Sequence, residues 1–178
     1  MVKKQEEPLF LDVKKNSPQG EDARELVDDI RRLCESQPFA VLATQGKGIT
    51  HASLISFSVS DDLKHIVFAT PVNTGKFDFI TAEENISILV DDRSLQQDNI
   101  NQISALTIIG KGKVLFDESY IIKWSEVLTK KHPNLNAFVK ASTTSVILIE
   151  VETYLYVKKF QQIRQWNPKS VVPVTNLK

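Results

Sequence analysis

The sequence has one cysteine, no net charge and no long apolar run, and each of these shortages excludes a class of protein. Because Cys34 is the single cysteine among 178 residues, no disulfide can form within the chain, which favours a cytoplasmic location. Basic and acidic residues number 22 each, so the formal net charge is zero, which argues against a nucleic-acid binder. No stretch approaches the about 18 uncharged apolar residues of a membrane span, and the first residues lack the apolar segment of a secretory signal.

Motifs for several common catalytic chemistries are also missing. The six glycines form neither the first turn of a dinucleotide-binding fold nor a nucleophile elbow of the G-x-S-x-G type. His51, His65 and His132 are far apart, and none stands near a second ligand type at a spacing that suits a metal. We therefore expect no metal site.

The composition that remains suits one folded domain, since 42% of the residues are hydrophobic. Charged residues with scattered proline and glycine predict an N-terminal arm at residues 1–20. The domain itself is expected at residues 21–160, followed by a C-terminal tail at 161–178. Apolar residues at helical spacing predict a helix at 21–36 and further helices within 118–140.

Between these helices the pattern is that of strands. Alternating or continuous apolar segments rich in β-branched residues occur at 39–44, 55–60, 65–69, 86–91, 104–116 and 146–157. Gly110 and Gly112 indicate a bulge or bend in the fifth segment. Tight turns between the early segments favour antiparallel pairing, so we predict a six-stranded, mostly antiparallel barrel with added helices, either closed or partly open.

One short stretch indicates a binding site. "ATPVNTGKFDFI", residues 69–80, places small polar residues and Lys76 between an apolar strand and a helix. It is not a Walker A loop, because Thr70 replaces the first glycine and Phe77 replaces the serine or threonine. Hydroxyl groups, free amides and an ammonium at a helix N-terminus suit a phosphate. An ordinary capped helix with a surface lysine would have the same sequence, and both readings remain open.

The order of elements favours the phosphate. "THASLISFSVSDDLKHIVFATPVNTGKFDFITAEENISILVDD", residues 50–92, resembles the flavin-binding half of the pyridoxamine 5′-phosphate oxidase-like split-barrel family. In that family a strand of small and apolar residues leads through an acidic hairpin to a strand ending in threonine, then to a polar loop, a helix and an "N-x-S-I-L-V" strand. The resemblance covers about residues 36–116 and weakens beyond them.

The resemblance implies FMN as the cofactor and names eight residues for it. The isoalloxazine edge and the ribityl chain would lie along Ser53, Leu54, Ile55 and Ser56. The ribityl and phosphate region would be reached by Ala69 and Thr70. The phosphate itself would be held by Thr74 and Lys76.

Two departures from the family pattern narrow what the resemblance implies. Gly75 stands where the family commonly has an arginine, so one bidentate phosphate contact is missing. Ser104 and Ala105 occupy the region where oxidase members carry a glutamine, which argues against pyridoxamine phosphate oxidase activity itself. Family members are homodimers with the flavin between two barrels, so we expect a homodimer in which the partner completes the site. Trp166 would either cover the flavin or pack against the protein.

Three functions follow from this reading. The first is an FMN-dependent oxidoreductase acting on a small molecule, in which the cofactor performs hydride or electron transfer. The second is a flavin- or haem-binding protein without turnover. The third is a reductase that uses the deazaflavin F420.

Overall fold

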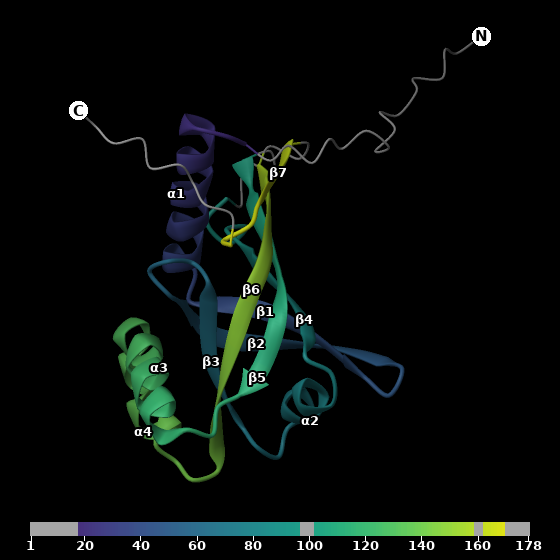
Figure 1. Ribbon diagram of the computed structural model, residues 1–178, viewed down its shortest axis with the longest axis vertical. Coiled ribbons are helices and arrows are strands. Elements are labelled where there is room, and N and C mark those ends of the chain that lie inside the picture. Colours follow the sequence, from purple (N-terminus) through teal and green to yellow (C-terminus); the bar gives the residue numbers. More distant parts are fainter. Residues whose placement is uncertain (1–17, 97–101, 159–161, 170–178) are drawn as a thin grey trace.

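The computed structural model describes residues 18–96, 102–158 and 162–169 (Figure 1). The predicted arm at residues 1–20 therefore lies outside the described residues, apart from its last three. The helices are α1 (Glu21–Ser36), α2 (Gly75–Ala82), α3 (Glu118–Lys131) and α4 (Asn136–Val139), with a 3-10 turn at Pro133–Leu135. The strands are β1 (Phe39–Gly46), β2 (Ile49–Val59), β3 (His65–Pro71), β4 (Asn85–Asp91), β5 (Ser104–Val114), β6 (Thr144–Lys158) and β7 (Gln162–Trp166).

The sheet is antiparallel throughout and closes on itself. Its strand order is β3-β2-β1-β4-β5-β6-β7, and an additional pairing of β3 with β6 closes a barrel of the first six strands. The predicted six-stranded antiparallel barrel with added helices is confirmed. Because the barrel is closed, each of the six strands is paired on both sides along at least part of its length. Fewer unpaired strand edges therefore remain to which other chains could add.

The long strand β6 explains why a seventh strand exists. One edge of β6 pairs with β5, while the other pairs with β3 along residues 144–150 and with β7 along residues 154–158. Strand β7 thus continues the pairing of β6 beyond the point where β3 ends. Part of the sequence assigned to a tail therefore belongs to the sheet.

Gly110 marks the bulge that the sequence predicts in β5. The register between β5 and β6 shifts between Ile109 and Gly110. A Cβ atom added at Gly110 would lie 2.4 Å from the main-chain oxygen of Glu150, a contact that no real side chain makes. Only glycine allows the two strands to approach this closely here.

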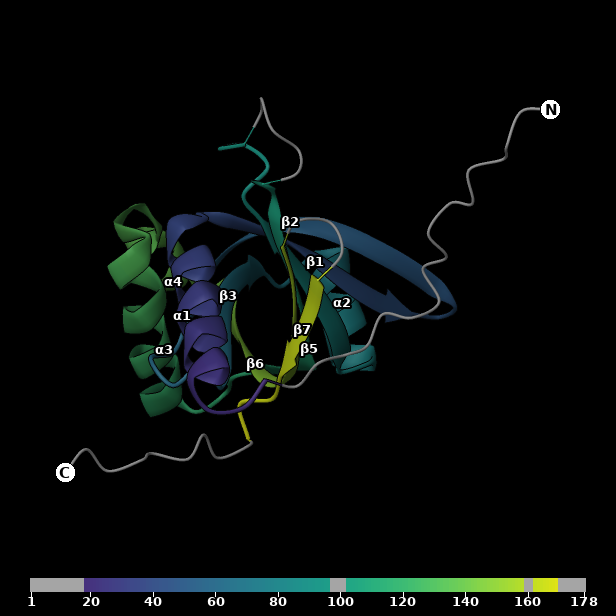
Figure 2. The same cartoon turned by 90° about the horizontal axis from the view of Figure 1, so that it is seen from above.

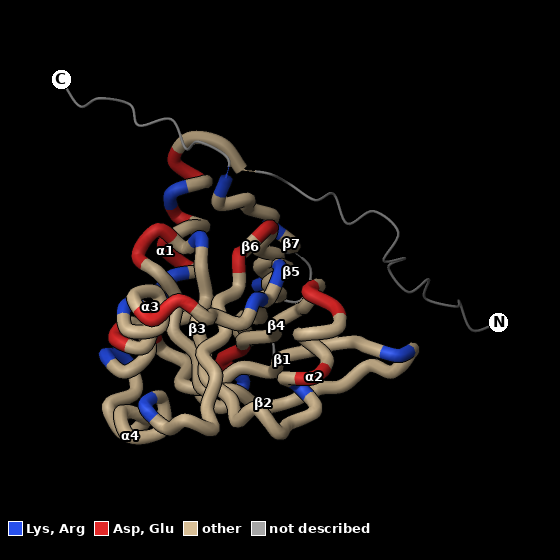
Figure 3. Tube along the Cα trace, turned by 60° about the horizontal axis from the view of Figure 1, so that its bottom comes forward, with Lys and Arg blue, Asp and Glu red and all other residues tan. Residues whose placement is uncertain are grey.

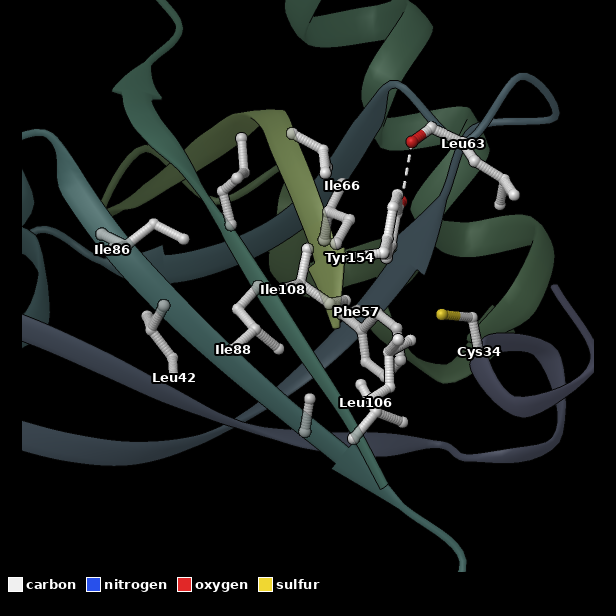
Figure 4. Close-up of a cluster of buried hydrophobic side chains, with 14 of the residues drawn as sticks. Cys34, Leu42, Phe57, Leu63, Ile66, Ile86, Ile88, Leu106, Ile108 and Tyr154 are labelled. Carbon is white, nitrogen blue, oxygen red and sulfur yellow. Dashed lines mark hydrogen bonds between the residues drawn. The ribbon is translucent and has the colours of Figure 1, made fainter. Parts of the chain in front are cut away.

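The barrel interior is filled by the inward side chains of alternating strand residues (Figure 4). Phe57, Ile88, Leu106, Ile108 and Tyr154 are all fully buried. Each such side chain contributes about 1.5–3 kcal/mol relative to an exposed one. Helix α1 adds its apolar face, including Cys34, to this core.

The helices cover the barrel unequally (Figure 2). Helices α1, α3 and α4 lie on one side, whereas α2 lies on the other, beside the β1–β2 hairpin. A second apolar cluster joins α3 and α4 to the outer side of β3 and β6; its buried members are Val67, Trp124, Leu128, Val139 and Val146. Phe79 of α2 lies beside Gly46 and His51, so the helix packs on the inner face of the β1–β2 hairpin, and Val41 and Leu54 point to the opposite face.

Candidate functional site

The junction between β3 and α2 holds two threonine side chains against each other. The Oγ1 atoms of Thr70 and Thr74 are 3.0 Å apart, and the Thr74 hydroxyl donates to the main-chain oxygen of Pro71 over 2.9 Å. Since the proton of Thr74 is used in this way, Thr70 donates to Thr74. Thr70 is buried, whereas Thr74 is partly exposed. Thr70 thus orients Thr74 and does not itself reach the surface.

The main-chain amides of the first two residues of α2 have no hydrogen-bond acceptor among the described residues. The amides of Phe77 and Asp78 both bond to the carbonyl oxygen of Thr74, at 3.0 and 3.1 Å. Thr74 precedes the helix without capping it through its side chain. In the part of the chain that the structure describes, the amides of Gly75 and Lys76 therefore remain free. Free amides at a helix N-terminus, with the helix dipole behind them, favour an anion.

Lys76 supplies the positive charge at this position. Its side chain is half-buried, and it forms no ion pair with any carboxylate of the described residues. Asp78, in the same first turn, is exposed and offsets part of this charge. The cluster of Thr74, Gly75 and Lys76 accordingly offers one ammonium and two amides to a ligand, beside the Thr74 hydroxyl, whose proton is bonded to Pro71.

The four predicted residues of β2 divide between the two faces of the strand. Ile55 is buried in the barrel core, and Ser53 faces the same side, with its hydroxyl 3.4 Å from Nδ1 of His51. Leu54 and Ser56 face outward, and Leu54 is 66% exposed. Because alternate residues of a strand point to opposite faces, only Leu54 and Ser56 present side chains to a ligand on the outer face.

The side chain of Ala69 also points outward from the barrel, on β3. It packs against the cluster beneath α3 and α4 and pairs with Val146 of β6. Because this cluster partly covers the side chain, a cofactor would contact Ala69 mainly through its main-chain atoms.

The uncovered face of the sheet carries an apolar patch that follows only in part from the sequence. Phe39 and Leu89 are 52% and 37% exposed, although both lie in the middle of the sheet. Val41 pairs directly with both Leu54 and Leu89, so these side chains form one cross-strand row. We call the following set the outer patch: Phe39, Val41, Leu54, Leu89 and Ile109.

Within this patch, β1 and β2 contain no Asp, Glu, Lys or Arg residue (Figure 3). The charged residues of the other two strands are Asp91 of β4 and Lys111 and Lys113 of β5. A partial signal for this face was present in the sequence, because segment 39–44 is apolar on both faces; in segment 86–91, Leu89 shares its face with Ser87 and Asp91. Strands of this kind are covered on both sides in folded proteins.

No further catalytic group joins this site. Among the residues with described positions, no three His, Cys, Asp or Glu side chains gather as a metal would require. Two cavities, of about 650 and 390 Å³, lie on the side of α1, and none of the eight predicted cofactor residues lines either of them. In the same described segments, no helix is long and apolar enough to cross a bilayer.

The sequence profile of the pyridoxamine 5′-phosphate oxidase family matches residues 26–158. The chain belongs to this family. The match covers both the barrel strands and the helices packed on them, and it includes all eight residues predicted for the cofactor. No curated protein sequence matches the chain.

Solved structures of the same fold bind different groups. The chain is similar to a putative pyridoxamine 5′-phosphate oxidase from Listeria innocua, with 19% identity, a TM-score of 0.58, and coverage of 74% of this chain and 98% of that one. It is also similar to an FAD-binding protein from Mesorhizobium loti, with 12% identity, a TM-score of 0.57, and coverage of 70% and 88%.

A haem-binding protein from Mycobacterium smegmatis superposes with a TM-score of 0.69 at 14% identity, with coverage of 78% of this chain. The chain spans 56% of that protein's length. At these identities the likeness shows the fold of the pyridoxamine 5′-phosphate oxidase family, a split barrel, and leaves the ligand to be argued from residues.

Proposed function

We propose that the protein binds FMN through the Thr74, Gly75 and Lys76 cluster and acts as an FMN-dependent oxidoreductase on a small molecule. The observation that carries this proposal is the pair of free helix amides beside a lysine without a carboxylate partner. A phosphate monoester carries up to two negative charges and several acceptor oxygens, so it complements this set of donors. FMN ends in such a phosphate.

The outer patch gives the proposal its second part, a homodimer. The apolar side chains of the outer patch are exposed together on one face of the sheet, and a patch of this kind favours an interaction surface. A second copy of the chain placed on this face would cover Leu54 and Leu89, and it would also shield the flat ring of a flavin lying along Leu54 and Ser56. Buried interfaces of this kind hold flat ligands well because both walls exclude water.

In this arrangement the chain contributes binding and orientation. The FMN ring supplies hydride or electron transfer when it is bound. The residues of β2 would fix the edge of that ring, while Thr74 and Lys76 would fix its phosphate. To donate to the phosphate, the Thr74 hydroxyl must turn from the carbonyl of Pro71, so Thr74 contributes less than the two free amides. We also propose a cytoplasmic location, which the single cysteine favours.

Comparing FMN with riboflavin tests the phosphate cluster, because riboflavin has the same ring without the phosphate. We expect the purified protein to bind FMN at least about tenfold more tightly than riboflavin. Lys76→Met should remove most of this difference and leave riboflavin affinity unchanged, as measured by calorimetry. Lys113→Met, an exposed lysine of β5, serves as the control. Equal affinities of the native protein for FMN and riboflavin would refute the cluster as a phosphate site.

Mass spectrometry of the cofactor that co-purifies separates FMN from F420 and haem. If FMN binds but the reduced flavin transfers electrons to no acceptor tested, the protein is a carrier or sensor and the oxidoreductase part of the proposal fails.

A second candidate is haem binding, favoured by the likeness to the haem-binding protein from Mycobacterium smegmatis. Haem carries two carboxylates in place of a phosphate, so Lys76→Met should lower haem affinity less than FMN affinity. A haem titration followed at the Soret band, with and without FMN present, decides between the two ligands.

A further inference from the structure

The larger cavity lies between the last turns of α1, the β2–β3 turn and helix α3, on the side of the barrel away from α2 (Figures 1 and 2). Its volume of about 650 Å³ falls in the range of small-molecule sites in proteins. It shares no residue with the cluster at Thr74 or with the outer patch. A ligand here would therefore bind independently of the proposed cofactor.

One wall of this cavity is aromatic and apolar. The rings of His65 and Trp124 lie 5.2 Å apart with a tilt of 49°. Val59 and Val127 line the same cavity. The indole Nε1–H of Trp124 is buried and has no acceptor among the described residues. A wall of this composition favours a flat, apolar ring.

Lys131 provides a fixed ammonium in the same cavity. Its Nζ donates to the main-chain oxygens of Cys34 and Gln37, at 2.7 and 2.8 Å, and lies 3.9 Å from the centre of the Phe57 ring. Two of its three hydrogens bond to these carbonyl oxygens and the ring of Phe57 lies beside it, so an anion in the cavity would be attracted mainly by its charge. Burial lowers the pKa of Lys131 from 10.5 to about 8, with Cys34 and Glu35 acting in the opposite direction. A half-buried ammonium without a carboxylate at ion-pair distance gains from a bound anion.

The remaining charges around the cavity set the charge of the ligand. Its basic side chains are Arg31, Lys123, Lys130 and Lys131, and its acidic ones are Glu35, Asp61 and Asp62. Asp62 already accepts from the Ser60 hydroxyl and the Lys64 amide. These four basic and three acidic side chains leave one unit of positive charge, which matches a monoanion.

We propose that this cavity binds a small aromatic carboxylate, with its ring against Trp124 and His65 and its carboxylate paired with the ammonium of Lys131. The ligand would act as a substrate or an effector that occupies a site separate from the flavin. The proposal does not depend on the proposed function, because none of its residues belongs to the phosphate cluster.

Benzoate is the probe, with benzamide as its uncharged analogue. NMR spectra of the full chain report binding through the two indole N–H signals. We expect benzoate to shift the signal of Trp124 saturably and to leave Trp166 unchanged, since Trp166 stacks on Tyr154 outside the cavity. Benzamide should bind at least about tenfold more weakly than benzoate. Equal binding of both compounds would overturn the role of the charge.

Two variants locate the site. Lys131→Met should lower benzoate affinity at least about tenfold, whereas Lys113→Met should leave it unchanged. Because Lys131→Met also removes two hydrogen bonds, Val127→Phe provides a second test: it keeps Lys131 and fills the cavity from α3. Unchanged benzoate affinity in Val127→Phe would overturn the proposal.

The pH dependence provides a signature that a structural lysine would not produce. Benzoate affinity should fall about tenfold or more between pH 7 and pH 9.5, as Lys131 loses its proton, while benzamide affinity stays constant. The thiol of Cys34 stays neutral over this range because burial raises its pKa to about 12. A benzoate affinity that does not change with pH would exclude Lys131 as the partner of the carboxylate.

Discussion

The hydroxyl of Tyr154 on β6 donates a hydrogen bond of 2.7 Å to the main-chain oxygen of Leu63, 91 residues away in the chain (Figure 4). Leu63 sits in the β2–β3 turn with a φ of 58°, in the left-handed region that a leucine rarely adopts. Both side chains are fully buried. The hydrogen bond therefore holds a strained turn residue against the closing strand of the barrel.

Replacing Tyr154 by Phe should lower the free energy of unfolding by about 1–3 kcal/mol, because the buried carbonyl of Leu63 loses its donor. Urea denaturation measures this change. Tyr156→Phe is the matched control, since Tyr156 lies on the same strand and its hydroxyl forms none of the hydrogen bonds described. A Tyr154→Phe variant as stable as the Tyr156→Phe variant would contradict this role.

Gly75→Arg should increase FMN affinity about tenfold, since it restores the bidentate contact that this chain lacks. A side chain fits at this position: a Cβ at Gly75 would have no atom within 4 Å, and the residue has no positive φ. Gly75→Ala restricts the backbone in the same way without adding a charge, and it should leave FMN affinity unchanged. An arginine variant that binds FMN no better than the alanine variant would argue against a phosphate at this helix end.

Leu54→Lys should convert the proposed dimer to a monomer, because an exposed residue of the outer patch would carry charge into the interface. Leu95→Lys is the control: Leu95 is 67% exposed, close to the 66% of Leu54, but it lies outside the outer patch. Analytical ultracentrifugation distinguishes the two states. If both variants sediment like the native protein, the outer patch is not the dimer interface.

The thiol of Cys34 should react slowly with Ellman's reagent at pH 8 in the native protein and completely after denaturation, because it is buried and its pKa is raised to about 12. A raised pKa also affects stability. The unfolded thiol loses its proton near pH 9.0, so the native state binds more protons between pH 9 and 12, and stability falls as pH rises through this range.

Cys34→Ala lacks this ionisable group, so its free energy of unfolding should fall less above pH 9 than that of the native protein. Subtracting the two curves cancels the opposite contribution of Lys131, whose lowered pKa favours the folded state as pH rises. Parallel curves for the two proteins would contradict the burial of a protonated thiol.

Local patterns in the sequence were sufficient for most of the barrel. Strand segments such as 86–91 and the bulge at Gly110 could be predicted because alternation, β-branching and glycine act within a few residues. Strand β7 could not be predicted in this way. Its residues Ile163–Trp166 have no strand alternation, and they pair because the edge of β6 beyond β3 is open.

The positions of the candidate site residues in the sequence could be predicted, but the directions in which their side chains point could be predicted only in part. The polar residues after β3 identify the start of α2, but nothing local indicates that Thr70 lies buried behind Thr74. The outward position of Leu54 follows from the inward position of Ile55, since the two alternate. Its apolar neighbours Phe39 and Leu89 come from other strands, so the outer patch appears only once the register of the sheet is known.

The closing strand β6, at Thr144–Lys158, follows the other five barrel strands in chain order. While the protein is being synthesised, β3 and β5 therefore lack this partner until all the other barrel strands have been made. A nascent chain stalled before β6 would expose two unpaired strand edges at once, to which neighbouring nascent chains could add. Premature termination in this gene should thus yield aggregated fragments and no shortened, folded barrel.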